Sequence, residues 1–298
     1  MMPETNYLNH IQRHFPDLDI ETVQINREGM VNISVIINRE RVFRFPRTEQ
    51  GVALQARERK ALELVRQFVD MPVPSWDYYS DEMVSYPFIP GEPLLTDDIL
   101  RMGQRDQDAL AAKLAAFLQQ MHSIPLGPIE AAGIKKSVTA RTTDDRLQFY
   151  AAVQEHLFPL MWADGREWVR RHFAPFLADH SMWDYEPCFI NGDLGTYHLL
   201  YDRGSNSFNG IIDFGTAGLG DPACDLGIII NQYGESFLRR MLRIYPEISQ
   251  HIEQARFQAG CAELEWVLRG IQSGDQGLFV AHIGRVRDAM PIGSGWPQ

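Results

Sequence analysis

The sequence predicts an α+β fold of two lobes, in which a small antiparallel sheet with one long helix precedes a larger, mainly helical lobe. β-branched and aromatic residues concentrate between residues 21 and 45, a break rich in proline and glycine follows at 90–93, and helical periodicity dominates beyond it. At 298 residues the chain is long enough for two lobes with a cleft between them. We therefore expect an N-terminal lobe at residues 1–89 and a C-terminal lobe at 92–298, with a hinge at about 86–91.

The N-terminal lobe is expected to open with three antiparallel strands, ETVQI, VNISVII and RVFRF, the first two separated by a turn at Glu28 and Gly29. Apolar side chains between residues 50 and 68 recur at a spacing that places them on one face, which predicts a helix. Two short strands are expected to follow, at 76–79 and 84–88. The lobe is therefore a small sheet that carries one long helix.

The C-terminal lobe shows mostly the period of helices, interrupted once. Helices are expected at about 110–121, 144–158 and 165–178, with further helices between 221 and 288. Residues 188–214 break this pattern and predict two short strands joined by the polar turn RGSN. Acidic and histidine side chains gather in this island where apolar runs end, so we expect the chemistry there.

Composition excludes several classes of protein. A net charge of -11 argues against a nucleic-acid partner and favours a cationic small molecule. No stretch approaches the ~20 apolar residues of a membrane span, and the first residues lack the pattern of a signal peptide, so a cytoplasmic protein with no membrane partner is expected. Cys188, Cys224 and Cys261 are odd in number and far apart, which predicts buried thiols and neither a disulfide framework nor a zinc site.

Two carboxylates and a histidine stand in the island where apolar runs end. Asp193 stands in NGDLGTYHLL, His198 follows five positions later, and Asp213 follows the apolar run in IIDFG. Phosphoryl transfer needs one group to position or deprotonate the acceptor hydroxyl, and others to hold Mg²⁺ against a triphosphate. Asp193 suits the first role, and His198 and Asp213 suit the second.

These motifs resemble the aminoglycoside phosphotransferase and protein-kinase-like superfamily, particularly its aminoglycoside 2''-phosphotransferase and macrolide kinase branches. The resemblance covers nearly the whole chain and rests on NGDLGTYHLL, GIIDFGTAGLGDPACDLG, FLQQMHSIPL, and VFRFPR followed by the helix that contains Glu58. It implies a two-lobed protein-kinase-like fold, with Asp193 as the catalytic aspartate and Asp213 as the Mg²⁺-binding aspartate of a DFG-like motif. His198 stands where the superfamily usually has asparagine, and the two branches are similar to this chain in having histidine there.

The resemblance also implies a cation on the third strand that contacts phosphate and pairs with a helix carboxylate. Arg44 in VFRFPR would be that cation and Glu58 its partner, although lysine is usual at this place. Arginine presents a planar fork, whereas lysine is a point charge. Arg47 is therefore an alternative phosphate contact.

The remaining nucleotide contacts are expected at the flap and the hinge. The loop at 27–32 stands where kinases keep a glycine-rich flap, with Gly29 as its one glycine. Residues 86–89 would form the hinge that binds the purine edge, where Tyr86 or Phe88 could narrow the pocket. Both ATP and GTP stay open as the phosphoryl donor.

The acceptor should lie against the helical lobe, next to Asp193. Among the acidic and aromatic residues of that lobe, Glu235 and Trp266 are our candidates for substrate binding. A polycationic acceptor would use several such carboxylates. Asp221 and Pro222 are instead expected to be the N-cap and first residue of a helix.

The sequence therefore predicts a kinase that phosphorylates a hydroxyl of a small molecule, with an aminoglycoside-like or macrolide-like antibiotic as the acceptor. A metabolic kinase of the same fold is the first alternative. A nucleotide-binding regulatory protein without catalysis is the second, and a hydrolase that uses the two aspartates as an acid and base is the third. The chain contains no GxxxxGK[ST], and GTAGLG has the wrong glycine order for a dinucleotide loop.

Overall fold

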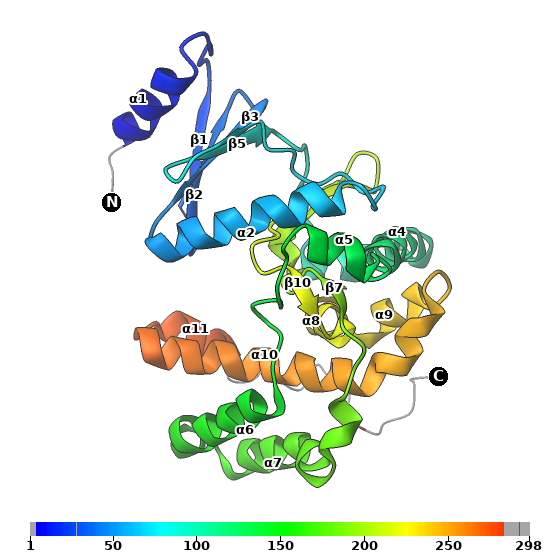
Figure 1. Ribbon diagram of the computed structural model, residues 1–298. Helices are drawn as coiled ribbons and strands as arrows, with labels where there is room; N and C mark the ends of the chain where they lie inside the picture. Colours follow the sequence, from blue (N-terminus) through cyan, green and yellow to red (C-terminus); the bar gives the residue numbers. More distant parts are fainter. Residues whose placement is uncertain (1–3, 28, 283–291, 293–298) are drawn as a thin grey trace.

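The computed structural model describes residues 4–27, 29–282 and 292. A five-stranded antiparallel sheet, in the order β1-β2-β3-β5-β4, forms the N-terminal lobe at the top of Figure 1. A larger, mainly helical part lies below it, and α2 crosses between the two. The expected α+β fold is thus confirmed.

The strands of the N-terminal lobe follow the β-branched segments of the sequence. Their bounds are β1 Val23–Asn26, β2 Asn32–Ile37, β3 Arg41–Pro46, β4 Tyr78–Tyr79 and β5 Val84–Pro87. In the register of β3 and β5, Val42 faces Tyr86 and Arg44 faces Val84. The expected turn between β1 and β2 includes Glu28, which lies outside the described residues.

A helix at the start of the chain was not predicted. α1 spans Glu4–His14, and its Tyr7 and Ile11 are buried in one cluster with the apolar side chains of β2 and β3. The two residues stand four positions apart, which is helical spacing on one face. α1 therefore covers a face of the sheet that would otherwise be exposed to water.

The long helix of the N-terminal lobe is α2, Glu49–Val65, which begins one residue before the predicted range of 50–68 and ends three residues before its end. Thr48 caps its start, and the hydroxyl accepts from the amide of Gly51 at 3.2 Å. The side chain of Arg57, on this helix, donates to the carbonyl of Ala217 at 3.0 Å and to the carbonyl of Lys136. α2 therefore contacts the larger lobe through its side chains as well as covering the sheet.

Helices form most of the larger lobe. They are α3 Thr96–Arg101, α4 Gln104–His122, α5 Leu126–Ala131, α6 Thr143–Ala152, α7 Ala163–Ala178, α8 Pro222–Tyr233, α9 Glu235–Met241, α10 Ile252–Ser273 and α11 Gln276–His282. α4 and α8 belong to the main core cluster, and the packing of α10 against α8 joins that core to the lower helices. Asp221 caps α8 and Pro222 opens it, as predicted. The range 221–288 holds four helices up to His282, and residues 283–288 lie outside the described chain.

The island at 188–214 forms short strands, as expected, with two partners that sequence reasoning did not supply. β7 Cys188–Ile190 pairs with β10 Gly218–Gly220, and β8 Leu199–Asp202 pairs with β9 Ser207–Ile211. β6, Glu92–Pro93, pairs with β8, although we expected the break at 90–93 to be irregular. β6 lies at the edge of its sheet, where proline leaves no ladder donor missing.

Other sequence expectations concern the cysteines and the membrane. Cys224 and Cys261 are buried, Cys188 is half-buried, and all three are free thiols. Among the described residues, no helix is both long and apolar enough to cross a bilayer.

An aromatic cluster joins α6, α7 and α10, and a buried histidine lies inside it. His172 stacks between Trp168 and Phe257, at ring separations of 4.6 and 5.0 Å. Its Nε2 donates to the carbonyl of Phe257 at 3.0 Å. Burial lowers the pKa of His172 from 6.5 to about 4, although the hydrogen bond to Phe257 opposes that change.

We expect this histidine to make the protein less stable in mild acid. The unfolded chain binds a proton at His172 below pH 6.5, whereas the folded chain does so only near pH 4, so stability falls as pH decreases across that window. The loss should approach about 3 kcal/mol, from ~1.4 kcal/mol per unit of pKa. Urea unfolding from pH 7 to pH 4 measures it.

His172→Gln is the matched variant, because its amide can still donate to the carbonyl of Phe257 without titrating. Its free energy of unfolding should vary with pH less steeply than that of the wild type. Parallel curves for the two proteins would show that His172 is not the group responsible.

Candidate active site

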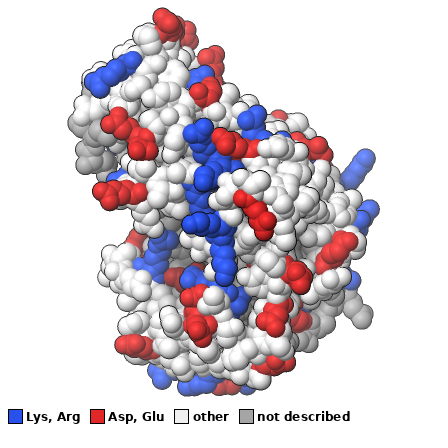
Figure 2. Space-filling model, viewed as in Figure 1, with Lys and Arg blue, Asp and Glu red and all other residues white. Residues whose placement is uncertain are grey.

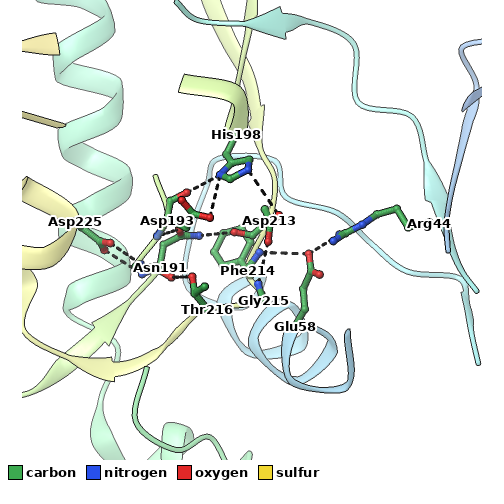
Figure 3. A network of polar contacts seen from close by, with 11 residues as sticks. Arg44, Glu58, Asn191, Asp193, His198, Asp213, Phe214, Gly215, Thr216 and Asp225 are labelled. Atoms are coloured by element: carbon green, nitrogen blue, oxygen red, sulfur yellow. Dashed lines mark hydrogen bonds and ion pairs between the residues drawn. The ribbon is translucent and has the colours of Figure 1, made fainter. Parts of the chain in front are cut away.

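The loop that follows β7 is held by its own backbone and by one asparagine. Gly192 has φ +78°, and a Cβ there would lie 2.6 Å from Oγ1 of Thr139, so no larger residue fits. The Asn191 side chain accepts from the amide of Asp193 at 2.8 Å and donates to the carbonyl of Asp213 at 3.0 Å. Asn191 thus fixes the two aspartate loops relative to each other, as Figure 3 shows.

His198 lies between the two aspartates. It ends a 3₁₀ turn, Thr196–His198, which aims the imidazole back over the loop. Its Nδ1 is 2.6 Å from the carbonyl oxygen of Asp193, and its Nε2 is 3.7 Å from Oδ2 of Asp213. Because a carbonyl only accepts, Nδ1 carries a proton, and in the neutral ring the lone pair is on Nε2, toward Asp213.

Asp213 has a left-handed backbone conformation, which is uncommon for residues other than glycine. Its φ is +64°, and Oδ1 accepts from the amide of Gly215 at 3.3 Å. Such a conformation is costly for most residues with a side chain, although aspartate adopts it more readily than most. It turns the carboxylate toward His198.

The three groups perturb one another's protonation. Burial raises the pKa of Asp193, against an opposite effect of His198. Burial disfavours protonated His198, but the two aspartates outweigh it and raise the pKa of that histidine. Burial likewise opposes the charge on Asp213, yet Arg44 and His198 hold the pKa of this carboxyl below its ordinary value. Asp213 is therefore the more firmly ionised of the two carboxylates.

A buried ion pair approaches Asp213 from the N-terminal lobe. Nη1 of Arg44 on β3 lies 2.8 Å from Oε1 of Glu58 on α2, and the two side chains are 8% and 1% exposed. The same Oε1 accepts from the amide of Phe214 at 3.3 Å. Glu58 keeps the pKa of Arg44 above its ordinary value, although burial opposes it. One carboxylate thus joins the strand cation to the loop of Asp213 (Figure 3).

With this geometry established, comparison with known proteins decides the family. Residues 24–257 match the sequence profile of the phosphotransferase enzyme family. The chain belongs to this family.

Individual members of the family are similar to the chain in different degrees. A match to viomycin phosphotransferase from Streptomyces vinaceus is 31% identical over 162 residues and covers 52% of this chain and 52% of that protein, so it spans about half of each. The GDP complex of wild-type aminoglycoside 2'-phosphotransferase-IIIa superposes with a TM-score of 0.86 at 26% identity, covering 97% of this chain and 98% of the other. Macrolide 2'-phosphotransferase type I gives 0.72 at 21% identity, covering 96% and 97%, and shows the shared fold.

The other predicted nucleotide contacts of this phosphotransferase lie around the N-terminal lobe. Gly29 is exposed between β1 and β2, and a Cβ there would meet the carbonyl of Asn32 at 2.8 Å. Tyr86 is buried on β5, and burial raises its pKa to about 12. Phe88 is half-buried with its ring 5.7 Å from the guanidinium of Arg39.

Arg47, the alternative phosphate contact, is exposed and donates to the carbonyl of Arg27, so it lies apart from the Arg44–Glu58 pair.

The two predicted substrate residues are in different surroundings. Both carboxylate oxygens of Glu235 accept from Arg256, at 2.8 and 2.9 Å, and the side chains are 3% and 1% exposed. Both oxygens of Glu235 are therefore already engaged by Arg256 within the helical lobe. Trp266 is half-buried on α10 with Arg269 over its ring at 5.3 Å, and the charge of Arg269 lowers the pKa of Asp193 against the larger effect of burial. Arg269, which stacks on Trp266, is thus close enough to Asp193 for its charge to act there, and the role of Trp266 in substrate binding stays a prediction.

Sequence reasoning missed the carboxylate beneath the Asp193 loop. Asp225 on α8 is fully buried, and its oxygens accept from the amides of Asn191 and Gly192 at 3.0 and 2.7 Å. His122, at the end of α4, contacts the same carboxylate at 3.1 Å. The signal was present as an aspartate inside the apolar face of a helix, CDLGIII, where a charge needs partners.

Asp225→Asn should loosen the catalytic loop. An amide offers one oxygen, so one of the two loop N–H groups loses its acceptor, at a cost of about 1.5–3 kcal/mol for a bond to a charged group. We expect kcat to fall about tenfold with little change in the KM for nucleotide. Steady-state kinetics beside urea unfolding measures both effects, and an unchanged kcat would remove Asp225 from the positioning of Asp193.

Proposed function

We propose that this phosphotransferase is a small-molecule kinase that moves the γ-phosphoryl of ATP or GTP to a hydroxyl of an antibiotic-like acceptor. The observation that carries the proposal is the convergence of Asp193, His198 and Asp213 beside the buried Arg44–Glu58 pair. These are the parts that phosphoryl transfer requires: a group for the acceptor hydroxyl, groups for a metal, and a cation for phosphate. The family membership and the superposition on a GDP complex support a nucleotide as donor.

Asp193 acts on the acceptor in this proposal. Its carboxylate accepts the hydrogen bond of the acceptor hydroxyl and holds that oxygen in line with the γ-phosphorus. The raised pKa makes this carboxylate a better base than one in water, which suits proton acceptance as the new P–O bond forms. Because the transition state is loose, positioning and charge stabilisation supply most of the rate.

Asp213 and His198 would hold Mg²⁺ with the nucleotide. Asp213 offers the carboxylate oxygens that this cation prefers, and neutral His198 directs the Nε2 lone pair to the same side. Among the described residues no cluster of three or more acidic, histidine or cysteine side chains forms a complete cage. Mg²⁺ is commonly bound by one or two protein ligands together with substrate phosphates and water. The ion would neutralise charge on those phosphates.

In this proposal the nucleotide lies between the N-terminal lobe, residues 1–89, and the C-terminal lobe, residues 92–298. Arg44, held by Glu58, neutralises phosphate oxygens, Gly29 lies in the flap, and Tyr86 and Phe88 border the base. The acceptor lies against α10, near Trp266. We further propose that the protein works in the cytoplasm, where nucleoside triphosphates are found, with neither nucleic acid nor membrane as a partner.

The names of relatives support an antibiotic-like acceptor. Their names state viomycin, aminoglycoside and macrolide as what those enzymes phosphorylate, and one solved complex holds GDP and kanamycin together. The net charge of -11 favours a cationic acceptor of this kind.

The test is nucleoside diphosphate release in Mg²⁺, with ATP and with GTP, across aminoglycosides, macrolides, peptide antibiotics and metabolic alcohols. Release that depends on one acceptor class establishes the kinase and names its substrate. Turnover of a metabolic alcohol alone would assign a metabolic kinase of the same fold, whereas nucleotide binding without any turnover would favour the regulatory alternative. A chain that does not bind nucleotide in calorimetry would contradict the proposal.

A further inference from the structure

A hollow on the surface lies apart from the network of residues drawn in Figure 3. The segment between α5 and α6, the start of α6 and residues 183–185 enclose about 350 Å³, which is within the usual size of small-ligand sites. Lys136, Arg141 and Arg146 all line it. Figure 2 shows that Lys and Arg side chains gather in a band down the middle of this face, over α2 and the segment after α5. On a chain of net charge -11, such a concentration calls for an anionic partner.

Buried hydrogen-bond donors without acceptors mark this hollow. Arg146 is only 5% exposed, and its Nε and Nη2 make no hydrogen bond to any described residue. Nε1 of Trp183, on the same wall, is also buried without an acceptor in the described chain. Oδ2 of Asp221, itself buried without a hydrogen bond to any described residue, lies 3.8 Å from Nη2 of Arg146, which is an ion-pair contact but too long for a hydrogen bond. Buried donors are normally satisfied, so three in one place indicate that oxygen atoms of a ligand belong there.

The carboxylates near the hollow leave part of its positive charge uncompensated. Glu265 accepts from Arg141 at 2.9 Å, and Asp221 accepts from the amide of Ala223 at 2.9 Å as the cap of α8. Burial raises the pKa of Asp221, which opposes its full ionisation. Asp184 also lines the hollow, but it is exposed to solvent, where its charge is screened. Arg146 and Lys136 therefore remain available for an anion.

The hollow lies at the opposite end of a short sheet from the catalytic loop. β7 and β10 pair so that Gly220 faces Cys188 and Gly218 faces Ile190. Residues 183–185 and Asp221 therefore lie beyond one end of this sheet, and the Asp193 loop beyond the other. Three residues of strand separate the ends by about 10 Å, from a rise of ~3.3 Å per residue. One small molecule with an acid group could span that distance.

We propose that this hollow binds an oxyanion, a phosphate or carboxylate group, through Arg146, Lys136 and the indole N–H of Trp183. Arg146 supplies a fork of donors suited to the paired oxygens of such a group, and its burial strengthens each bond. The group belongs either to the acceptor itself, as an acid substituent remote from the phosphorylated hydroxyl, or to a free anion that binds beside the acceptor. The oxyanion site itself does not depend on the proposed kinase activity, and only the assignment of the group to the acceptor rests on that proposal.

The test uses inorganic phosphate as the probe and the full chain saturated with Mg²⁺ and a non-hydrolysable ATP analogue, so that all three phosphate positions of the nucleotide site are filled. Calorimetry should detect one phosphate per chain. Lys136→Ala should weaken binding about tenfold or more, because a charged hydrogen bond is lost. Lys135→Ala is the matched control, since Lys135 is the exposed neighbour that does not line the hollow and should leave binding unchanged.

Arg146→Gln should abolish phosphate binding while ADP affinity stays that of the wild type. If this buried substitution prevents folding, the Lys136→Ala and Lys135→Ala pair still decides the question. Absence of phosphate binding in the wild type saturated with the ATP analogue, or equal binding by the two lysine variants, would overturn the site. Either result is read without turnover, so it is independent of whether the kinase proposal holds.

Competition distinguishes the two sources of the oxyanion. If the group belongs to the acceptor, phosphate should raise the KM of an acid-bearing acceptor without changing kcat, and Lys136→Ala should raise the same KM. If the group is a free anion, phosphate should bind together with the acceptor and leave its KM unchanged. Both outcomes support the site.

Discussion

Asp193→Asn is expected to lower kcat by about 10²–10⁴-fold, the range that a positioned acid or base contributes, while the affinity for nucleotide stays nearly constant. The amide keeps the size of the carboxylate but cannot accept the proton of the acceptor hydroxyl. We expect the loop to keep its conformation, because Asn191 and Asp225 bind its backbone amides and do not contact the Asp193 side chain. The measurements are kcat in the diphosphate-release assay and Kd for ADP by calorimetry.

Asp164→Asn is a suitable control for this variant, since Asp164 is exposed at the start of α7. It should retain wild-type kcat. An Asp193→Asn enzyme with undiminished turnover would show that the acceptor is activated by another group, and a parallel loss of nucleotide affinity would place Asp193 in the donor site.

Glu58→Gln should destabilise the protein by about 3–5 kcal/mol, because it leaves the buried guanidinium of Arg44 without a counter-charge. The same substitution weakens the acceptor that holds the amide of Phe214, so kcat/KM should fall as well. Urea unfolding gives the free energy of unfolding, and steady-state kinetics gives the second effect.

Two further variants separate stability from function here. Glu63→Gln lies on the same helix and breaks an exposed pair with Arg59, with side chains 61% and 50% exposed, so it should change stability by less than about 1 kcal/mol. Replacing both Arg44 and Glu58 with methionine removes the unpaired charge and should recover much of the stability without the activity. A stable, active Glu58→Gln enzyme would contradict the role given to this pair.

Local patterns in the sequence were sufficient for much of the fold and for part of the site. The strands at 23–46 and the hairpin of β8 and β9 have alternating or continuous apolar runs, which depend only on neighbours in the chain. The cap at Asp221 is equally local. The convergence of Asp193, His198 and Asp213 was expected because the three stand within one short island.

Contacts between distant segments could not be read in this way. Glu235 looked like a free carboxylate until α10 supplied Arg256, 21 residues further along the chain. Asp225 depends on a loop more than 30 residues before it and on a histidine from α4. Such roles follow from which helices pack together, and periodicity gives no information on that packing.

The double use of the Glu58 carboxylate has a consequence for regulation. Protein kinases can be switched off by swinging the helix that bears this glutamate away from its cation. Here one oxygen of Glu58 contacts both the strand cation and the amide of Phe214, so that the strand, the helix and the loop of Asp213 are held together. We therefore expect an enzyme that is active without a modification, whose progress curves start without a lag.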